Sequence, residues 1–330
     1  MLTNSDFQKA AEIVKKSKNV LITTHTKPDG DACGSVAAIY EALTALGKKA
    51  QVLLLTELPG WYEHLFSQKP IMLKDFKQNE PAFDLLIIVD TNSYSQLEGL
   101  EDFLKQNKKP VLVIDHHPTS DNIGDVELID TAAAAAGLIV LDFIKYAKWP
   151  ITKKVAEALF VAIASDTGWF QFRNTDSRVY RNCAELIDAG AGPTEIYHQL
   201  YHNFSPSRFK LLAAMLGTLQ LHFDGRYAEQ YLTQEDFKKA GAAYKDTESF
   251  IDECRRIKTV EAAAMFIELD NGIIKCSMRS NNSVDVCKIA QKFGGGGHTA
   301  AAGTHLPGPL QNAMQIIKVE VEKQLIQKQK

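Results

Sequence analysis

Side chains that can bind metals or transfer protons follow a short apolar run near position 115. The run Val111–Ile114 is β-branched and unbroken, which is the pattern of a strand buried on both faces of a parallel sheet. Asp115, His116 and His117 come directly after it. Carboxylates and imidazoles in one place can hold divalent cations or exchange protons with a substrate. This stretch is therefore the first candidate for the chemistry of the chain.

Three other apolar runs also lead into such side chains, and we interpret them as further strand ends. They are residues 20–24 before His25, Asp29 and Asp31, residues 85–89 before Asp90, and residues 160–164 before Asp166. Residues 153–164 fit a helix equally well, because periodicity alone does not separate a buried helix from a buried strand. Since ligands of an open α/β sheet bind outside the carboxyl ends of its strands, we expect these side chains to meet.

If they meet, the electrostatics require cations. Four carboxylates crowded together repel one another, so they either take up protons or bind metal ions. Two divalent ions would neutralise Asp29, Asp31, Asp90 and Asp166. The addition of His25 and His116 gives an oxygen-rich set with some imidazole, which suits Mn²⁺, Fe²⁺ or Mg²⁺. Asp90 stands alone at its strand end, and we expect it to bridge the two ions.

Composition limits the class of partner and the compartment. The chain has 330 residues, enough for two domains, and its 37 Lys and Arg are balanced by 40 Asp and Glu. It therefore lacks the basic field that binds long duplexes, although small anionic substrates remain compatible. The five cysteines form no C-x-x-C pair, which argues against a zinc ribbon or a disulfide framework. We expect a reducing, cytoplasmic location.

No segment predicts membrane insertion. Residues 1–18 are polar and amphipathic and show no secretory signal pattern. The longest apolar stretch, residues 132–141, is too short to span a bilayer and is interpreted as a buried helix.

Alternating strand and helix patterns predict a doubly wound parallel sheet in residues 1–190. A helix beginning near Gly34 would point its N-terminus at the polar strand ends and favour bound anions. Residues 191–225 form a helical linker in this interpretation. Residues 226–330 predict a smaller mixed-sheet α/β domain, with Asn271-Gly272 as a hairpin turn.

The second domain carries a phosphate-binding pattern of its own. Four consecutive glycines, Gly294 to Gly297, precede His298, and their backbone N–H groups can approach an anion closely. Arg279 and Ser280 supply a cation and a hydroxyl. The alternative is a surface arginine together with a flexible helix end.

Aromatic residues follow Asp166. Trp169, Phe170 and Phe172 could stack a base, and Arg173 could meet a phosphate. The alternative is that the rings pack the edge of the domain.

The polar motifs resemble those of a known family when they are taken together. They are His25-x-x-Pro28-Asp29-Gly30-Asp31, the strand-ending Asp90, Asp115-His116-His117, Asp166-Thr167-Gly168 and the glycine run ending at His298. In this order they resemble the motifs of the DHH phosphoesterase superfamily and of its associated C-terminal domain, over almost the whole chain. The two-domain layout is similar to the branch of bacterial oligoribonucleases and pAp phosphatases.

The resemblance implies the roles of the residues. One metal ion would be held by His25, Asp29 and Asp90, and a second by Asp31, Asp90, His116 and Asp166. Phosphate groups of the substrate would contact His117, Arg279, Ser280, Gly295, Gly296, Gly297 and His298. His117 would also act on the leaving oxygen, and Asp115 would orient an imidazole rather than bind metal.

The implied activity is that of a Mn²⁺-dependent phosphoesterase. It would degrade di- to pentaribonucleotides to mononucleotides and convert pAp to AMP, by attack of hydroxide at two metal ions. The partners would be short single-stranded RNA and pAp, with no long duplex and no membrane. A cyclic di-AMP or pApA phosphodiesterase is the alternative. Cleavage polarity and oligomeric state stay open.

Overall fold

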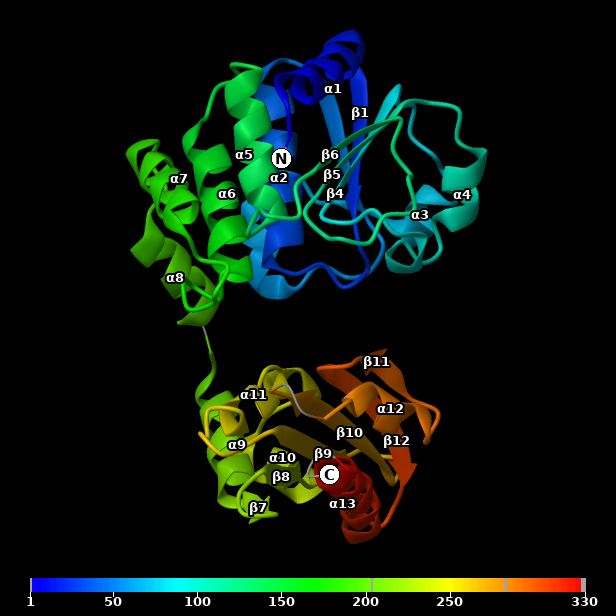
Figure 1. The fold of residues 1–330 in the computed structure, drawn as a ribbon, viewed down its shortest axis with the longest axis vertical. Helices are drawn as coiled ribbons and strands as arrows, with labels where there is room; N and C mark the ends of the chain where they lie inside the picture. The colour runs from blue at the N-terminus through cyan, green and yellow to red at the C-terminus, as the bar shows by residue number, and fades with distance from the viewer. Residues whose placement is uncertain (1, 203, 282–283, 328–330) are drawn as a thin grey trace. The chain divides into compact units, whose positions relative to one another are not determined.

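The chain folds into two compact units, each built around a sheet of its own (Figure 1). The computed structural model describes residues 2–202, 204–281 and 284–327. The units comprise residues 1–203 and 204–330, so the division falls inside the segment interpreted as a linker. Helix α8 (Pro193–Tyr201) packs on the first unit, whereas α9 (Pro206–Gly217) packs on the second.

The first unit contains a six-stranded sheet in which every pair of neighbours is parallel, in the order β3-β2-β1-β4-β5-β6. The order reverses between β1 and β4, which is the switch point where such sheets bind ligands. The predicted doubly wound parallel sheet is confirmed. Its strands are β1 (Asn19–Thr24), β2 (Lys49–Leu54), β3 (Ile71–Met72), β4 (Leu85–Val89), β5 (Val111–Asp115) and β6 (Val126–Ile129).

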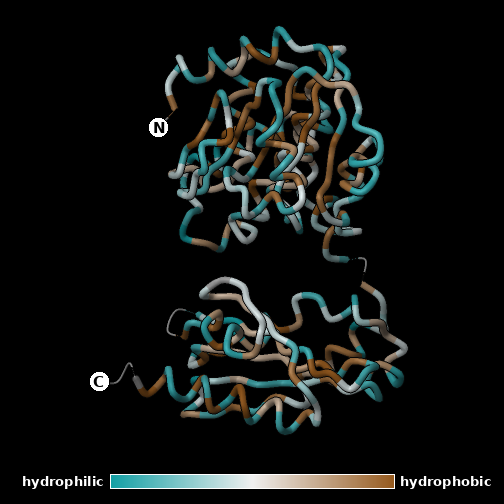
Figure 2. Tube along the Cα trace, turned by 90° about the vertical axis from the view of Figure 1, so that its right-hand side faces the viewer, coloured by the Kyte–Doolittle hydropathy of each residue, from teal (hydrophilic) through white to brown (hydrophobic). Residues whose placement is uncertain are grey.

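Helices cover both faces of this sheet (Figure 1). Side chains of β1 alternate between two apolar cores: Val20 and Ile22 face α2, α5 and α6, whereas Leu21 faces the side of α3 and α4. In Figure 2 the strands accordingly run as hydrophobic segments inside the unit. The helices are α1 (Asn4–Lys16), α2 (Gly30–Ala45), α3 (Leu73–Phe76), α4 (Glu101–Gln106), α5 (Ala136–Tyr146), α6 (Lys153–Asp166), α7 (Ser177–Asp188) and α8, with 3-10 turns η1 (Gly60–Leu65) and η2 (Tyr94–Gln96).

The interpretation of residues 160–164 as a strand is wrong, because they lie within α6, and Asp166 is the last residue of that helix. Nearly every residue from Val155 to Ala164 is buried, since α6 packs against α2, α5 and α7. A helix covered on several sides shows no apolar stripe, so its sequence pattern resembles that of a buried strand. The predicted helix after the first strand is confirmed, but it begins at Gly30 and so includes Asp31.

The second unit is the predicted smaller mixed-sheet domain. Its six strands have the order β11-β12-β10-β9-β8-β7; β8 and β9 are parallel and the other pairs antiparallel. The predicted turn at Asn271-Gly272 joins β9 to β10, and Gly272 has φ of +76°. The elements are β7 (Gln220–His222), β8 (Tyr227–Leu232), β9 (Ala262–Glu268), β10 (Ile273–Ser280), β11 (Gly296–His298), β12 (Ala301–Pro307), α9, α10 (Gln234–Ala240), α11 (Ile251–Cys254), α12 (Val286–Gln291), α13 (Leu310–Gln327) and the 3-10 turn η3 (Tyr244–Thr247).

Among the described residues, no helix combines the length and apolarity that crossing a bilayer requires.

The closest helix packing in the first unit depends on Gly34. A Cβ atom at this position of α2 would lie 2.8 Å from the backbone nitrogen of Ala162 and collide with the carbonyl of Ala158, both on α6. Backbone atoms cannot turn aside as a flexible side chain can. Gly34 therefore lets α2 and α6 approach closely, and α2 carries Asp31.

We predict that Gly34→Ala lowers the free energy of unfolding of the first unit by about 1–3 kcal/mol or more, because it overpacks this crossing. Urea titration followed by tryptophan fluorescence measures it, since all three tryptophans (Trp61, Trp149 and Trp169) lie in this unit. Gly60→Ala is the matched control, because a Cβ atom there would meet no heavy atom within 4 Å. Equal stability of the two variants would contradict the packing argument.

Candidate active site

Asp90 lies at the centre of the polar cluster. It follows β4 at the carboxyl edge of the sheet, is 2% exposed, and has φ of +62°, a left-handed conformation that Asp tolerates better than most residues. Its Oδ1 atom is buried and has no hydrogen-bond partner among the described residues. His116 Nε2 lies 3.5 Å from this oxygen. A buried carboxylate oxygen that makes no hydrogen bond is costly, so this atom is placed to receive a cation.

His25 and Asp29 approach Asp90 from the end of β1. His25 Nδ1 lies 2.8 Å from the carbonyl of Thr26, so donation there leaves Nε2 free to act as a ligand. That Nε2 atom lies 3.4 Å from Asp90 Oδ2. Asp29 caps α2: its Oδ1 accepts from the backbone N–H groups of Asp31 and Ala32. Ligand atoms of His25, Asp29 and Asp90 all lie within 4.8 Å of one another, close enough to share an ion.

A second group consists of Asp31, His116 and Asp166, whose ligand atoms also lie within 4.8 Å of one another. His116 Nε2 is 3.5 Å from Asp166 Oδ2, 3.8 Å from Asp31 Oδ2 and 3.5 Å from Asp90 Oδ1. Its Nδ1 lies 3.1 Å from the carbonyl of Ala133, which orients the ring as Thr26 orients His25. Asp90 therefore stands between the two groups.

Asp31 is 1% exposed and is held by backbone donors at the start of α5. Its Oδ2 accepts from Ala136 N at 2.6 Å, and its Oδ1 accepts from Gly137 N at 2.9 Å and from Ser35 Oγ at 3.0 Å. Helix N-termini favour negative charge, so α5 stabilises the carboxylate that the interior disfavours.

The sequence analysis did not predict the three hydrogen bonds that Asp31 accepts from Ala136, Gly137 and Ser35. The amides of Ala136 and Gly137 gave no signal, because a backbone donor carries no side-chain signature and the alanine run 132–136 suggested only a buried helix. Ser35 could have been found, since it lies four residues after Asp31 on the same helical face.

The cluster shifts the pKa of its members strongly. Burial opposes charging of His25 and His116, but hydrogen bonding to Asp90 and the nearby carboxylates outweigh burial and raise their pKa to about 9 and about 10. Burial, with repulsion from Asp90, raises the pKa of Asp166 to about 6. Burial, followed by the charges of Asp90 and Asp166, raises the pKa of Asp31 well above its ordinary value. Without cations the site holds protons in their place.

The donor set fits divalent metal ions. It offers four carboxylates and two imidazoles, each imidazole oriented by a backbone carbonyl, together with the partnerless Asp90 Oδ1. No thiol belongs to any of the three candidate groups found among the described residues. Such a set suits Mn²⁺, Fe²⁺ or Mg²⁺.

His117 forms a third group with Asp90 and His116, whose ligand atoms also lie within 4.8 Å of one another, and Asp115 lies beside it. Asp115 is fully buried at the end of β5, and its Oδ1 accepts from His117 Nδ1 at 2.8 Å and from the backbone N–H groups of His116 and His117. This hydrogen bond is the main reason that the pKa of His117 is raised. The His117 side chain is 51% exposed, so it can meet a substrate while Asp115 fixes its ring.

The substrate-type residues of the second unit gather at one end of β10. Arg279 donates to the carbonyl of Met278 and lies 3.9 Å from Asp252, with its side chain 32% exposed. Ser280 is 4% exposed, and its hydroxyl accepts from Val284 N and donates to the carbonyl of Glu261. Its contacts are thus internal to the unit, whereas Arg279 retains exposed donors.

The glycine run leads into β11 of the six-stranded sheet of the second unit, which we call sheet B. A Cβ atom at Gly295 or Gly297 would collide with the backbone of β12, so sheet packing alone requires glycine at both positions, whereas Gly296 faces open space. The backbone of His298 pairs with Ala301, but its side chain lies outside the described residues. Arg173 belongs to the first unit, where it is exposed on the loop after α6.

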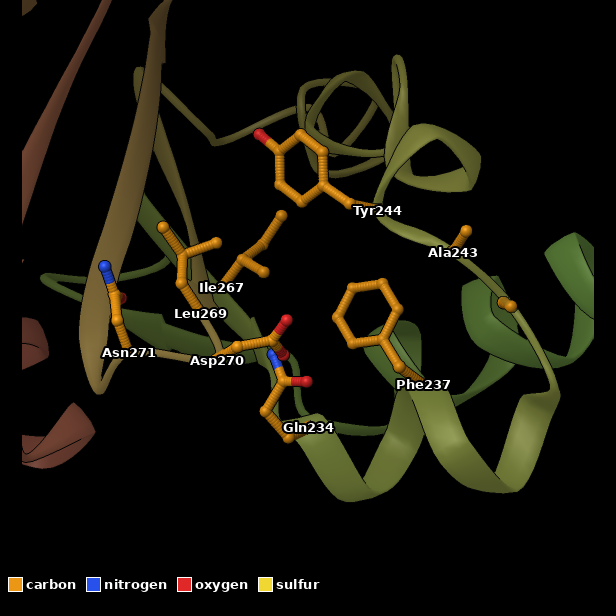
Figure 3. A pocket seen from close by; sticks show the side chains of 9 residues that line it. Gln234, Phe237, Ala243, Tyr244, Ile267, Leu269, Asp270 and Asn271 are labelled. Atoms are coloured by element: carbon orange, nitrogen blue, oxygen red, sulfur yellow. The ribbon is translucent and has the colours of Figure 1, made fainter.

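A pocket of about 550 Å³ lies at the opposite end of sheet B and contains none of the predicted site residues (Figure 3). It opens between α10 and the end of β9, beside the rings of Phe237 and Tyr244. Of its nine lining residues only Asp270 and Tyr244 can ionise, and the Tyr244 hydroxyl accepts a hydrogen bond from Lys275. The chemistry therefore resides in the carboxylate cluster and not in this pocket.

Comparisons with known proteins agree with this arrangement. Residues 19–163 match the DHH family, N-terminal domain, and residues 224–325 match the DHHA1 domain. The bifunctional oligoribonuclease and PAP phosphatase NrnA of Thermus thermophilus is 33% identical over 301 residues, which cover 90% of this chain and 87% of that protein.

Solved structures share the fold. An exopolyphosphatase-related protein from Bacteroides fragilis matches with a TM-score of 0.89 and 23% identity, over 97% of this chain and 96% of that one. The exonuclease RecJ bound to manganese matches with a TM-score of 0.56 and 16% identity, over 98% and 94%. The family match, the Thermus relative that is 33% identical and the cluster at the switch point of the sheet all agree. The chain therefore belongs to the DHH family of phosphoesterases and carries a C-terminal DHHA1 domain.

Proposed function

We propose that this enzyme degrades short oligoribonucleotides to mononucleotides and dephosphorylates pAp to AMP. The observation that carries the proposal is the convergence of the metal-type groups on the buried Asp90, which belongs to two of them and lies 3.5 Å from His116 of the other. The Thermus relative, named for both activities, supports the choice of substrates. A cytoplasmic location fits substrates of this kind.

Two divalent ions complete the site in this proposal. His25 and Asp29 would hold one ion, Asp31, His116 and Asp166 the other, and Asp90 would bridge them. Bound ions would act as Lewis acids on the phosphoester and supply hydroxide at neutral pH. We favour Mn²⁺ because mixed carboxylate and imidazole donors suit it and because a structural neighbour binds manganese.

The protein's own groups position the substrate and manage protons. His117 donates a proton to the leaving oxygen in this proposal, because its ring is half exposed and the hydrogen bond to Asp115 raises its pKa, which favours the charged form. Asp115 holds that ring in place through Nδ1. The guanidinium of Arg279 and the amides of the glycine run bind a terminal phosphate of the substrate, and Arg173 another.

Substrate choice is tested by parallel turnover assays with Mn²⁺, and then with chelator, on pAp, di- to pentaribonucleotides, pApA, cyclic di-AMP and pyrophosphate. Mononucleotides from short RNA together with phosphate from pAp would support the proposal. Preference for cyclic di-AMP would replace it with the signalling phosphodiesterase alternative. Activity that survives the chelator would exclude the metal site.

Asp90→Asn should lower turnover by more than about 100-fold, since groups that merely orient metal ligands cost up to that much when removed. Asparagine is chosen because it tolerates the left-handed backbone of this position. Turnover of pAp and manganese content are measured together. Asp102→Asn, an exposed position on α4, is the control. Wild-type turnover by the Asp90 variant would rule out the bridging role.

Metal binding should release about two or more protons at pH 8. With pKa values of about 9 and 10, His25 and His116 are both largely protonated at this pH in the metal-free site, and each must lose its proton to bind an ion. Manganese affinity should therefore rise with pH through this range. Calorimetry in buffers of different ionisation enthalpy counts the protons.

The proton count has a matched control in His25→Gln, which should reduce the release by about one. If the wild type released almost no protons on binding metal, both imidazoles would be neutral beforehand. That is the state expected at pH 8 for a histidine with the ordinary pKa of about 6.5.

Arg279→Ala should raise KM for pAp by about 10- to 100-fold, the range expected for one hydrogen bond to a charged group. The effect should be much smaller on a phosphodiester that lacks a terminal phosphate. Arg256→Ala is the control, because that side chain is 80% exposed and pairs with Glu253. Equal effects of Arg279→Ala on both substrates would remove its role in binding the terminal phosphate.

A further inference from the structure

The three aromatic residues after Asp166 have different environments. Trp169 and Phe170 are partly buried and pack against the core of the first unit, each with its ring near that of Phe160. Trp169 also donates to the hydroxyl of Tyr201 at 2.8 Å. The side chain of Phe172, by contrast, is 60% exposed and belongs to no core cluster. The packing interpretation therefore accounts for the first two rings and leaves Phe172 unexplained.

The backbone that presents Phe172 is strained and tied to the active site. Gly168, Trp169 and Phe170 have φ values of +56°, +53° and +67°, a conformation that bulky residues rarely adopt. Such strain persists only where the surrounding structure enforces it, and it is typical of functional sites. The run begins two residues after Asp166, the proposed metal ligand, so its first residue, Gly168, lies within about 7 Å of Asp166.

Local contacts fix the position of the ring. The Phe172 amide donates to the carbonyl of Thr167 at 3.0 Å. Its ring lies against Gly168, where a Cβ atom would come within 2.5 Å of the ring and displace it from this position. Asn174 donates to the carbonyls of Asp166 and Ala134, at 3.1 and 3.2 Å, which binds the loop to the metal cluster. The ring is thus preorganised rather than loosely attached.

The surroundings of the ring indicate what it binds. Its sequence neighbours Gln171, Arg173 and Asn174 are all exposed and polar, so Phe172 is the apolar side chain in an exposed polar segment. Arg173 supplies a cation beside it. An exposed ring, a cation and a phosphate-type metal site within one short segment match the chemistry of a single nucleotide, whose base stacks on aromatic rings without regard to sequence.

We propose that Phe172 is the stacking platform for the base of the nucleotide whose phosphate is bound at the carboxylate cluster. This inference rests on the proposed function and extends it. Stacking would let the site accept any base while it disfavours phosphoesters that have none, and Phe172 would act through binding and not through the chemical step.

The test compares AMP with ribose 5-phosphate, which differs from AMP only by the missing base. Calorimetry measures both affinities for the manganese-loaded wild type and for Phe172→Leu. The wild type should bind AMP about 5- to 150-fold more tightly, the range found for stacking of one base. Phe172→Leu should lose most of that preference, with little change for ribose 5-phosphate, and Phe172→Tyr should retain it.

Tyr146→Leu is the matched control, because Tyr146 is an exposed ring at the far end of α5, about 15 Å along the helix from the residue that binds Asp31. It should leave both affinities unchanged. A preference for AMP that survives in Phe172→Leu, or no preference in the wild type, overturns the proposal.

Kinetics separate this inference from the proposed function. On pApA, Phe172→Leu should raise KM and leave kcat unchanged, because a stacking contact binds ground state and transition state alike. If KM for pApA were the same in the wild type and in Phe172→Leu, the stacking role of Phe172 would be refuted and the proposed function would stand. Absence of hydrolysis of pAp and of short RNA by the wild type would refute the proposed function, while the AMP comparison would still decide the role of Phe172.

Discussion

The mutual repulsion of buried carboxylates is the constraint on which the first unit depends. Asp31 and Asp90 are almost completely buried, and Asp166 lies beside them, so charge of one sign accumulates where water cannot screen it. The metal-free site compensates with protons, as the raised pKa of both His25 and His116 shows. Divalent cations would compensate more completely, since each ion carries two charges and could also bind the Asp90 oxygen that makes no hydrogen bond.

Backbone dipoles and close helix packing also help to stabilise the buried carboxylates. The N-terminus of α2 is capped by Asp29, and the N-terminus of α5 donates two amides to Asp31. Both helices thus direct their positive ends at the carboxylates. In addition, α2 and α6 approach closely at Gly34, and α6 ends at Asp166. The site therefore combines strand ends with one helix C-terminus.

In our proposal the first unit hydrolyses the phosphoester, and the second unit binds a terminal phosphate of the substrate. The first unit contains the metal-type residues and the exposed ring of Phe172, and the second contributes the partly exposed guanidinium of Arg279. The glycines near Arg279 show how one motif can satisfy two demands. Gly295 and Gly297 are required by the approach of β12, while Gly296 is open and can present its backbone to an anion. Packing thus explains much of a pattern that the sequence analysis interpreted as phosphate-binding, with a flexible helix end as the alternative.

The sequence by itself determined the sheet, the two-domain layout and the convergence of the polar strand ends, because buried parallel strands leave an unbroken apolar pattern and their carboxyl ends must share one edge. It did not determine that residues 160–164 are helical, since a helix buried on several sides loses the stripe that identifies it. The sequence also did not predict the backbone amides of Ala136 and Gly137 as donors to Asp31, because a backbone N–H has no side-chain signature. Only the tertiary structure distinguished Phe172 from Trp169 and Phe170, because burial depends on what packs against a ring and not on the type of the ring.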